Sequence, residues 1–378
     1  MAEPVLVVVF LRGGADGLGL VSPASDPDFI AARPADLRVA RSGDGAGHAL
    51  TQDIADVDFR FHPAAAPLAD LYRAGDLSLI HAAGLTDATR SHFDAEARIE
   101  RAALSGSAGG WLGRWLAQAQ PGGDLPALAV GTALPGSLRG GQAAVAGELA
   151  DLMVARGHWL APALRQRLAS GFGNHGPLDL AVQELLALSA MVGSRIWSDA
   201  SAEVLPYAPA TEYPADNPLS QPLMTVAQTI KLGMGLRVAT VDAPGWDTHV
   251  RQSGQFSDLV GQLSTALMAF WRDLGPLQPD VSVVVMSEFG RRLRSNASGG
   301  TDHGRGNVMM VLGPQAKGGR MLGRWPGLAN DALDEGADLA VTTDYRAILA
   351  ELLTGHMKTP DLAAIFPDFT AKPVGLWG

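Results

Sequence analysis

The segment that decides the fold is VLVVVFLRGGADGL, residues 5–18, near the start of the chain. Val5 to Leu11 form an unbroken and largely β-branched apolar run, which is typical of a strand buried on both faces of a parallel sheet. A glycine-rich turn follows and carries Arg12 and Asp16. The segment therefore predicts an α/β protein whose first strand lies inside the sheet and delivers charged side chains to its edge.

Similar apolar runs recur along the chain, and helical patterns separate them. Five further buried strands are predicted at 77–82, 125–131, 236–243, 281–286 and 307–313. Apolar residues at helical spacing predict amphipathic helices at 68–75, 91–104, 109–119, 221–235, 255–275 and 342–355. This alternation predicts the α/β class, with a mostly parallel central sheet and helices on both faces. We expect one domain over residues 1–378, with a mainly helical insertion at about 145–220.

The composition excludes several classes of protein. Hydrophobic residues make up 47% of the 378 residues and charged residues 18%, so a large core can form and disorder is not expected. The formal net charge is −10 and no block of lysines and arginines occurs, which argues against nucleic acid or an anionic membrane surface as the main partner. There are no cysteines. Any metal must therefore be held by carboxylate, imidazole or hydroxyl groups.

The sequence also bears on location. No apolar stretch approaches the roughly 20 residues that cross a bilayer, so no membrane span is predicted. The first apolar segment is too short for a signal peptide and has no basic lead-in. As written, the chain predicts a cytoplasmic protein, or a periplasmic or secreted one if an export leader has been removed. No feature of the sequence specifies an oligomeric state.

Ionisable and hydroxyl residues gather at five predicted strand ends, the place where ligands bind in open α/β sheets. These residues are Arg12 and Asp16; Ser91 and His92; Asp247 and His249; Glu288 and Arg291; and Asp302, His303 and Arg305. One such carboxylate alone commonly caps a helix or belongs to a turn. Several together would oppose folding unless a positive charge compensates them, and a divalent cation does so. The sequence therefore predicts one or two divalent ions: zinc, manganese, magnesium or calcium.

A cation next to a hydroxyl group indicates a reaction class. The Ser91 oxygen would lose its proton more readily beside a metal and become a nucleophile. Arg12, Arg291 and Arg305 are candidates for holding the remaining oxygens of a phosphate or sulfate group. The expected substrate is therefore a small anionic ester.

Five motifs together resemble a known family. They are FLRGGADGL (10–18), RSHFDA (90–95), GWDTH (245–249), SEFGRR (287–292) and GGTDHGRGN (299–307). The set is similar to a bacterial family of unknown function related to the sulfatases, within the alkaline phosphatase-like superfamily. The resemblance covers nearly the whole chain and implies an alkaline phosphatase-like fold with metal-dependent chemistry on phosphate or sulfate esters. Many members carry a twin-arginine export leader, which the sequence as written does not show.

The resemblance also implies roles for individual residues. The implied metal ligands are Asp16, Asp247, His249, Glu288 and His303, and the implied nucleophile is Ser91. Phe289 stands where the superfamily has a second ligand imidazole. This departure implies one metal ion instead of two, or His92 as the substitute ligand. Asp302 is implied as a partner of His303 or as a co-ligand.

The predicted function is thus a metal-dependent hydrolase that acts on a phosphate or sulfate ester through Ser91, with His92 and Asp302 as ligands or acid/base groups. A sulfatase mechanism based on a cysteine-derived formylglycine is excluded, because the chain has no cysteine. Two alternatives remain open. One is a non-catalytic or structural-metal binding protein that retains the fold, and the other is a metal enzyme with non-hydrolytic chemistry.

Overall fold

The computed structural model describes residues 3–50, 56–103, 107–173, 176–313 and 317–377. Its centre is a nine-stranded sheet in the order β15-β5-β14-β11-β1-β10-β6-β7, with β16 paired to β5. The strands are β1 (Val5–Leu11), β5 (Leu77–Gly84), β6 (Ala127–Val130), β7 (Ala144–Ala146), β10 (Val238–Ala243), β11 (Val281–Ser287), β14 (Asn307–Leu312), β15 (Arg320–Leu322) and β16 (Thr343–Asp344). All six predicted strands are present. The sequence analysis missed β7, β15 and β16.

The direction of the strands places several chain segments at one edge of the sheet. Strand β1 is parallel to β10 and β11, and Leu11 pairs with both Ala243 and Ser287, so these three strands end together. Strand β14 is antiparallel to both of its neighbours, β11 and β5. The residues that precede Asn307 therefore lie at the same edge as the residues that follow β1, β10 and β11.

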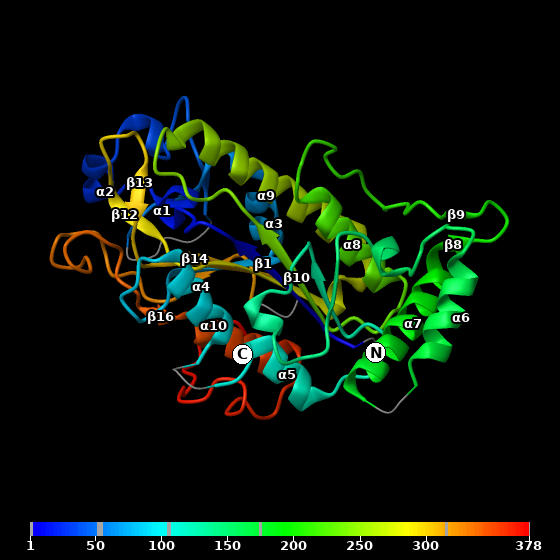
Figure 1. Ribbon diagram of the computed structural model, residues 1–378. Coiled ribbons are helices and arrows are strands. Elements are labelled where there is room, and N and C mark those ends of the chain that lie inside the picture. Colours follow the sequence, from blue (N-terminus) through cyan, green and yellow to red (C-terminus); the bar gives the residue numbers. More distant parts are fainter. Residues whose placement is uncertain (1–2, 51–55, 104–106, 174–175, 314–316, 378) are drawn as a thin grey trace.

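Helices cover both faces of this sheet (Figure 1). One face packs against α3 (Ala66–Ala74), α8 (Ser220–Lys231) and α9 (Gln252–Leu274), and the other against α4 (His92–Arg101), α5 (Trp111–Ala119) and α10 (Tyr345–Glu351). Alternate residues of β1 enter the two cores: Val7 and Val9 enter one, Leu6 and Val8 the other. The continuous apolar run is thus explained by burial on both sides. The predicted fold class is confirmed.

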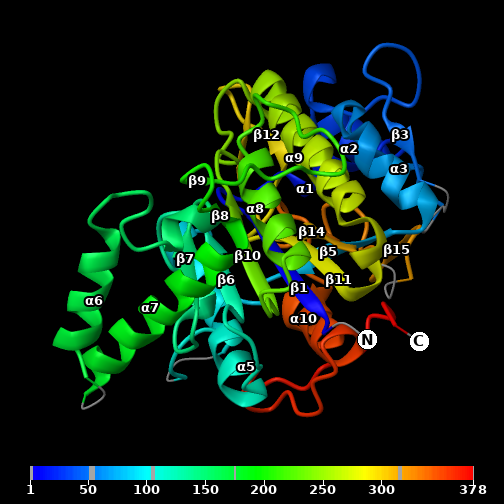
Figure 2. The same cartoon turned by 90° about the vertical axis from the view of Figure 1, so that its right-hand side faces the viewer.

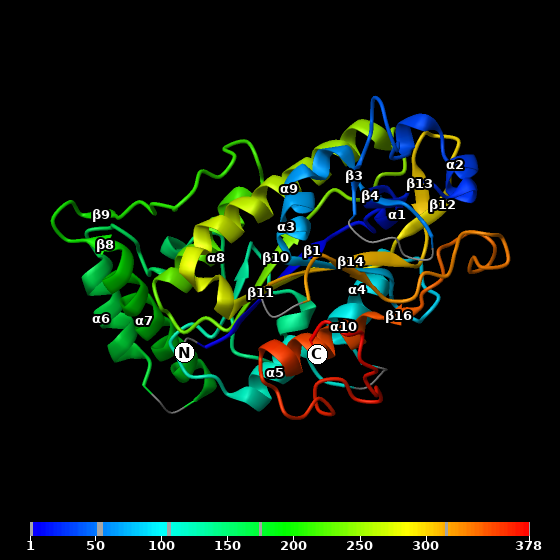
Figure 3. The same ribbon diagram turned by 180° about the vertical axis from the view of Figure 1, so that it is seen from behind.

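Two smaller groups of elements lie at opposite ends of the sheet (Figure 3). At one end, within the predicted insertion, the helices α6 (Ala161–Gly171) and α7 (Pro177–Ile196) project from the body with β8 (Trp197–Ser198) and β9 (Glu203–Val204) (Figure 2). At the other end are α1 (Gly17–Leu20), β2 (Val21–Pro23), α2 (Pro27–Ala32), β3 (His48–Ala49), β4 (Phe59–Phe61), β12 (Arg291–Ser295) and β13 (Thr301–His303). None of the helices in the described ranges is long and apolar enough to span a membrane.

Candidate metal centre

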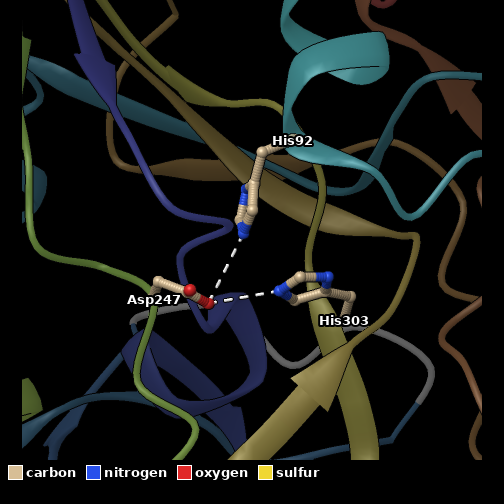
Figure 4. Close-up of side chains that lie close together, drawn as sticks. All are labelled: His92, Asp247 and His303. Carbon is tan, nitrogen blue, oxygen red and sulfur yellow. Dashed lines mark hydrogen bonds and ion pairs between the residues drawn. The ribbon is translucent and has the colours of Figure 1, made fainter.

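Four predicted site residues meet at the edge where β1, β10 and β11 end. His92 is the first residue of α4, Asp247 and His249 lie in the loop after β10, and His303 ends β13, shortly before β14. Figure 4 shows the side chains of His92, Asp247 and His303 pointing toward one another from three separate segments. The antiparallel direction of β14 is what brings His303 here, since a parallel strand would carry it to the opposite edge.

The three imidazoles converge on one carboxylate oxygen of Asp247. Oδ1 of Asp247 lies 3.1 Å from Nε2 of His249, 3.2 Å from Nε2 of His303 and 3.5 Å from Nε2 of His92. The Nε2 atoms of His249 and His303 are 2.8 Å apart. Ligand atoms around a tetrahedral zinc ion at 2.0–2.1 Å are about 3.4 Å from one another. His92, Asp247 and His303 each offer a ligand atom within 4.8 Å of the other two, a spacing that one such ion can bridge, and His249 contacts Asp247 and His303.

Each of the three imidazoles is held by its other ring nitrogen, Nδ1. In His92 this atom is 2.7 Å from Oε1 of Glu288, and in His303 it is 2.8 Å from the main-chain carbonyl oxygen of Arg90. In His249 it is 3.3 Å from Oδ1 of Asp302. A carbonyl or carboxylate oxygen accepts a hydrogen bond, so each Nδ1 is the protonated nitrogen and each Nε2 carries the lone pair. The tautomers are thereby set for metal ligation.

This arrangement leaves polar atoms that a cation would satisfy. With protons on Nδ1, two lone pairs face each other across the 2.8 Å between His249 and His303. Nε2 of His92 is buried and makes no hydrogen bond within the described part of the chain. Burial also lowers the pKa of His303, which favours its neutral form and disfavours a proton as the bridge. The donor set therefore fits a divalent cation.

Asp247 is the anionic member of the cluster. Burial alone would raise its pKa, but the hydrogen bond and the positive charge of Arg291 outweigh this and hold the pKa below its ordinary value. Its side chain is 48% exposed, whereas that of Arg291 is fully buried. The centre is therefore reached from solvent on one side and backed by a buried guanidinium group on the other.

Arg291 does not have the predicted role of clamping a substrate oxyanion. Its guanidinium donates to Oδ1 of Asp247 at 2.7 Å and to the carbonyl oxygens of Gly14, Trp246 and Thr301 at 2.5–2.9 Å. These partners belong to three different segments around the centre. Because its donors are used internally, Arg291 ties the loops together and positions Asp247.

Glu288 also has a different place from the one predicted. Its fully buried carboxylate accepts hydrogen bonds from Nδ1 of His92, from the main-chain N–H of Gly13 at 2.8 Å and from Oγ of Ser287 at 2.9 Å. It orients His92 and lies behind the ligand atoms. The contact at Gly13 needs glycine, since φ is +117° and a Cβ would lie 2.5 Å from the main-chain nitrogen of Asp247.

Asp302 holds His249, whereas the sequence analysis paired it with His303. Its side chain is 50% exposed, and the same Oδ1 atom accepts a hydrogen bond from Asn296 at 3.0 Å. The sequence analysis missed Asn296, which also binds the carbonyl oxygen of His249 at 2.9 Å. No sequence signal identifies this residue, because its contact to His249 links it to another loop, 47 positions away in the chain.

The two carboxylates behind the histidines lead to a prediction. We expect Glu288→Gln to lower the affinity for zinc by roughly 10–100-fold, the usual effect of removing an outer partner of a ligand histidine. Asp302→Asn is expected to have a smaller effect, because its contact to His249 is longer and half exposed to solvent. Zinc competition titrations against a chromogenic chelator measure both. An equal loss of zinc affinity in the two variants would contradict the expectation that the buried Glu288 supports its histidine more strongly than the exposed Asp302 does.

Asp16, the first predicted ligand, is not part of the cluster. Both of its oxygens accept hydrogen bonds from the buried Arg33, at 2.6 and 2.9 Å. Nε2 of Gln252 and the main-chain N–H of Gly19 add bonds of 2.7 and 3.1 Å. The carboxylate is fully buried and its charge is compensated by a side chain. The sequence analysis missed Arg33, which stands before a proline and shows no pattern that would single it out.

The other two arginines that were predicted to hold the ester oxygens, Arg12 and Arg305, form ion pairs within the protein. Arg12 forms ion pairs with Glu100 at 2.5 Å and with Asp242 at 3.0 Å. Arg305 forms a close ion pair with Asp334. Both guanidinium groups are thus paired with carboxylates of the protein, and their charges are compensated internally.

Ser91 lies beside the cluster. It precedes α4, is exposed to solvent, and its side chain makes no capping hydrogen bond to the helix. Its neighbours in the chain both contact the centre, Arg90 through its carbonyl oxygen and His92 through its ring. Ser91 is therefore next to the candidate centre in the chain, and its hydroxyl group is not used to stabilise the helix.

The fold and the site together define an α/β protein with a three-histidine, one-aspartate cluster at the carboxyl ends of its central strands. The chain belongs to the family described as "Protein of unknown function (DUF1501)", whose model matches residues 79–361. The predicted membership in a family of unknown function is thereby confirmed. No curated protein sequence matches the chain.

Several solved structures are similar to the chain over most of its length. The zinc complex of the C-terminal periplasmic domain of EcEptC from Escherichia coli matches with 8% identity and a TM-score of 0.44, over 98% of this chain and 88% of that chain. An alkaline phosphatase from the Antarctic bacterium TAB5 matches with 10% identity and a TM-score of 0.35, over 83% and 92%. BT1596, a 2-O GAG sulfatase, matches with 11% identity and a TM-score of 0.32, over 84% and 65%. Likenesses at this level do not define a function for this chain.

Proposed function

We propose that His92, Asp247, His249 and His303 bind one divalent transition-metal ion, and that the protein is a metal-dependent hydrolase of a phosphate or sulfate ester. The observation that carries the proposal is the convergence of three Nε2 lone pairs on one carboxylate oxygen, with each Nδ1 committed to an acceptor. Imidazole-rich sites favour zinc and similar cations over magnesium or calcium. Asp16 and Glu288 are occupied by internal partners, which supports a single ion.

The surroundings of the cluster support a catalytic site more than a structural one. Structural zinc sites are closed, whereas here Asp247 is about half exposed and Ser91, the residue before the ligand His92, is exposed to solvent. A bound divalent cation supplies Lewis acidity for a phosphoryl or sulfuryl oxygen. Ser91 is the candidate nucleophile, because its hydroxyl is solvent-accessible and forms no helix cap.

A second candidate function is metal binding without ester hydrolysis. It is favoured by the ion pairs of Arg12 and Arg305 and by the buried contacts of Arg291, since these were the groups expected to hold the ester oxygens. A non-hydrolytic metal enzyme or a metal-binding protein would not require them.

Metal analysis and an ester panel separate the two functions. We expect protein purified without added metal to contain one equivalent of zinc or a similar cation, and to hydrolyse at least one chromogenic phosphate mono-, phosphate di- or sulfate ester. Turnover is expected to fall to background in Ser91→Ala and after chelation, and to return when the metal is restored. Ser201→Ala, an exposed serine outside the site, is the control. Bound metal without turnover on any ester would favour the second function.

A further inference from the structure

A pocket of about 400 Å³ lies along one face of α4, and Phe93, its first member, follows His92 in the chain. Its α4 residues include Phe93, Glu96 and Glu100, at helical spacings that place them in one row. At 1.5 Å per residue, the row extends about 12 Å from Phe93 to Arg101. None of the four proposed ligands lines the pocket, but it begins one residue after His92, and its Glu96 interacts electrostatically with His92 and Glu288.

Two parts of the pocket next to the centre have complementary properties. Phe93 is 89% exposed, which leaves an aromatic face uncovered in the pocket wall. Glu96 has only a loose contact of 3.6 Å with Arg12, so its oxygens can accept hydrogen bonds. A flat apolar face next to a carboxylate acceptor matches a ring that carries hydroxyl groups. An unsubstituted aryl ring would leave the carboxylate unused.

The far part of the pocket is positively charged. Arg101 and Arg139 both line it, and neither guanidinium group has a hydrogen bond or ion pair to another residue in the described ranges. Glu100, the acid next to Arg101 in the row, accepts from Arg12 and from the main-chain N–H of Gly136 at 3.1 Å instead. The two guanidinium groups are thus available to an anion, in contrast to the arginines at the metal centre.

The geometry points to a subsite for the part of the substrate remote from the reacting ester: a sugar ring against Phe93 and an anionic group, carboxylate, sulfate or phosphate, between Arg101 and Arg139. This inference rests on the proposed function and specifies its substrate class as an ester of an acidic oligosaccharide. Guanidinium groups bind such anions through paired, charge-assisted hydrogen bonds.

Two synthetic disaccharide phosphonates test the subsite without turnover. They are identical except for the distal ring, which is glucuronate in one and glucose in the other. Calorimetry on the full chain is expected to show the glucuronate probe binding at least about tenfold more tightly. In the Arg101→Met/Arg139→Met variant this preference is expected to disappear while the affinity for the glucose probe stays within about twofold. Arg101→Lys/Arg139→Lys should retain part of the preference, and thermal unfolding of both variants checks that they fold.

The outcomes separate this inference from the proposed function. Three outcomes would each overturn the subsite. They are equal affinities of the two probes, a preference that survives in the methionine variant, and no binding of the glucuronate probe. Chelation tests the proposed function on the same samples, because it should weaken both probes equally if the phosphonate binds at the metal. If chelation changes neither probe's affinity while the glucuronate preference persists, the proposed function is contradicted and the anion subsite stays in place.

Discussion

Replacing His303 with alanine is expected to lower the affinity of the protein for zinc by roughly 10²–10³-fold. Four-ligand zinc sites bind with about 10–16 kcal/mol at neutral pH, so each ligand contributes about 2.5–4 kcal/mol. A factor of ten corresponds to about 1.4 kcal/mol, which gives the expected range. His303 is a strong test because its Nε2 contacts both Asp247 and His249, and its Nδ1 is fixed by a main-chain carbonyl that mutation of other side chains leaves unchanged.

Competition with a chromogenic chelator measures this affinity, and elemental analysis of the purified protein gives the occupancy. His158→Ala is the matched control: it removes an exposed imidazole in the segment before α6, where the ring stacks on Trp159. We expect the control to bind zinc as the unmodified protein does. Unchanged zinc affinity in His303→Ala would exclude His303 as a ligand and with it the proposed centre.

The strands that were predicted from sequence are those whose burial leaves a strong pattern. Strand β1 is apolar throughout and β11 is mostly apolar, because both faces of each strand are covered. Strands β7, β15 and β16 have two or three residues each and lie toward the sheet edges. The direction of β14 was not predictable from its composition. An apolar run of six residues reads the same in a parallel and in an antiparallel strand.

The ligand candidates were predictable to the extent that strand ends identify them. His249 and His303 belong to glycine-containing motifs next to predicted strands, and the structure brings them together. The roles of Glu288 and Arg291 were not predictable, because a charged side chain at a strand end can bind an ion, an imidazole or a main-chain carbonyl. The choice depends on partners such as Gly13, which is 275 positions away from Glu288 in the chain.

The role of Asp16 was likewise not predictable from its place after a strand. Its substitution is the one for which we expect the largest effect on stability. Asp16→Ala is expected to lower the free energy of unfolding by about 3–5 kcal/mol, the usual cost of leaving one partner of a buried ion pair uncompensated. The uncompensated group is Arg33, which is fully buried and would keep only its bonds to the carbonyl oxygens of Arg292 and Leu293. Urea unfolding measures the loss, and Asp36→Ala, at an exposed carboxylate, is the control.

The double variant Asp16→Ala/Arg33→Met identifies the cause, because removing the orphaned charge should restore most of the lost stability. Zinc affinity is expected to change by less than about tenfold in Asp16→Ala, well below the effect of a ligand substitution. A loss of zinc as large as that in His303→Ala, without a loss of stability, would reinstate Asp16 as a ligand.

The pH dependence of the same variant gives an independent check. Burial alone would raise the pKa of Asp16, but the charge and hydrogen bonds of Arg33, with those of Gln252 and Gly19, hold it below its ordinary value. A carboxylate with a lowered pKa contributes stability at pH values above its unfolded pKa of about 3.9, and this contribution is lost as the pH falls toward the folded value. The stability difference between the unmodified protein and Asp16→Ala should therefore be constant above about pH 5 and narrow below about pH 4. A difference that grows on acidification would mean that Asp16 is protonated in the folded protein and that Arg33 is compensated by another group.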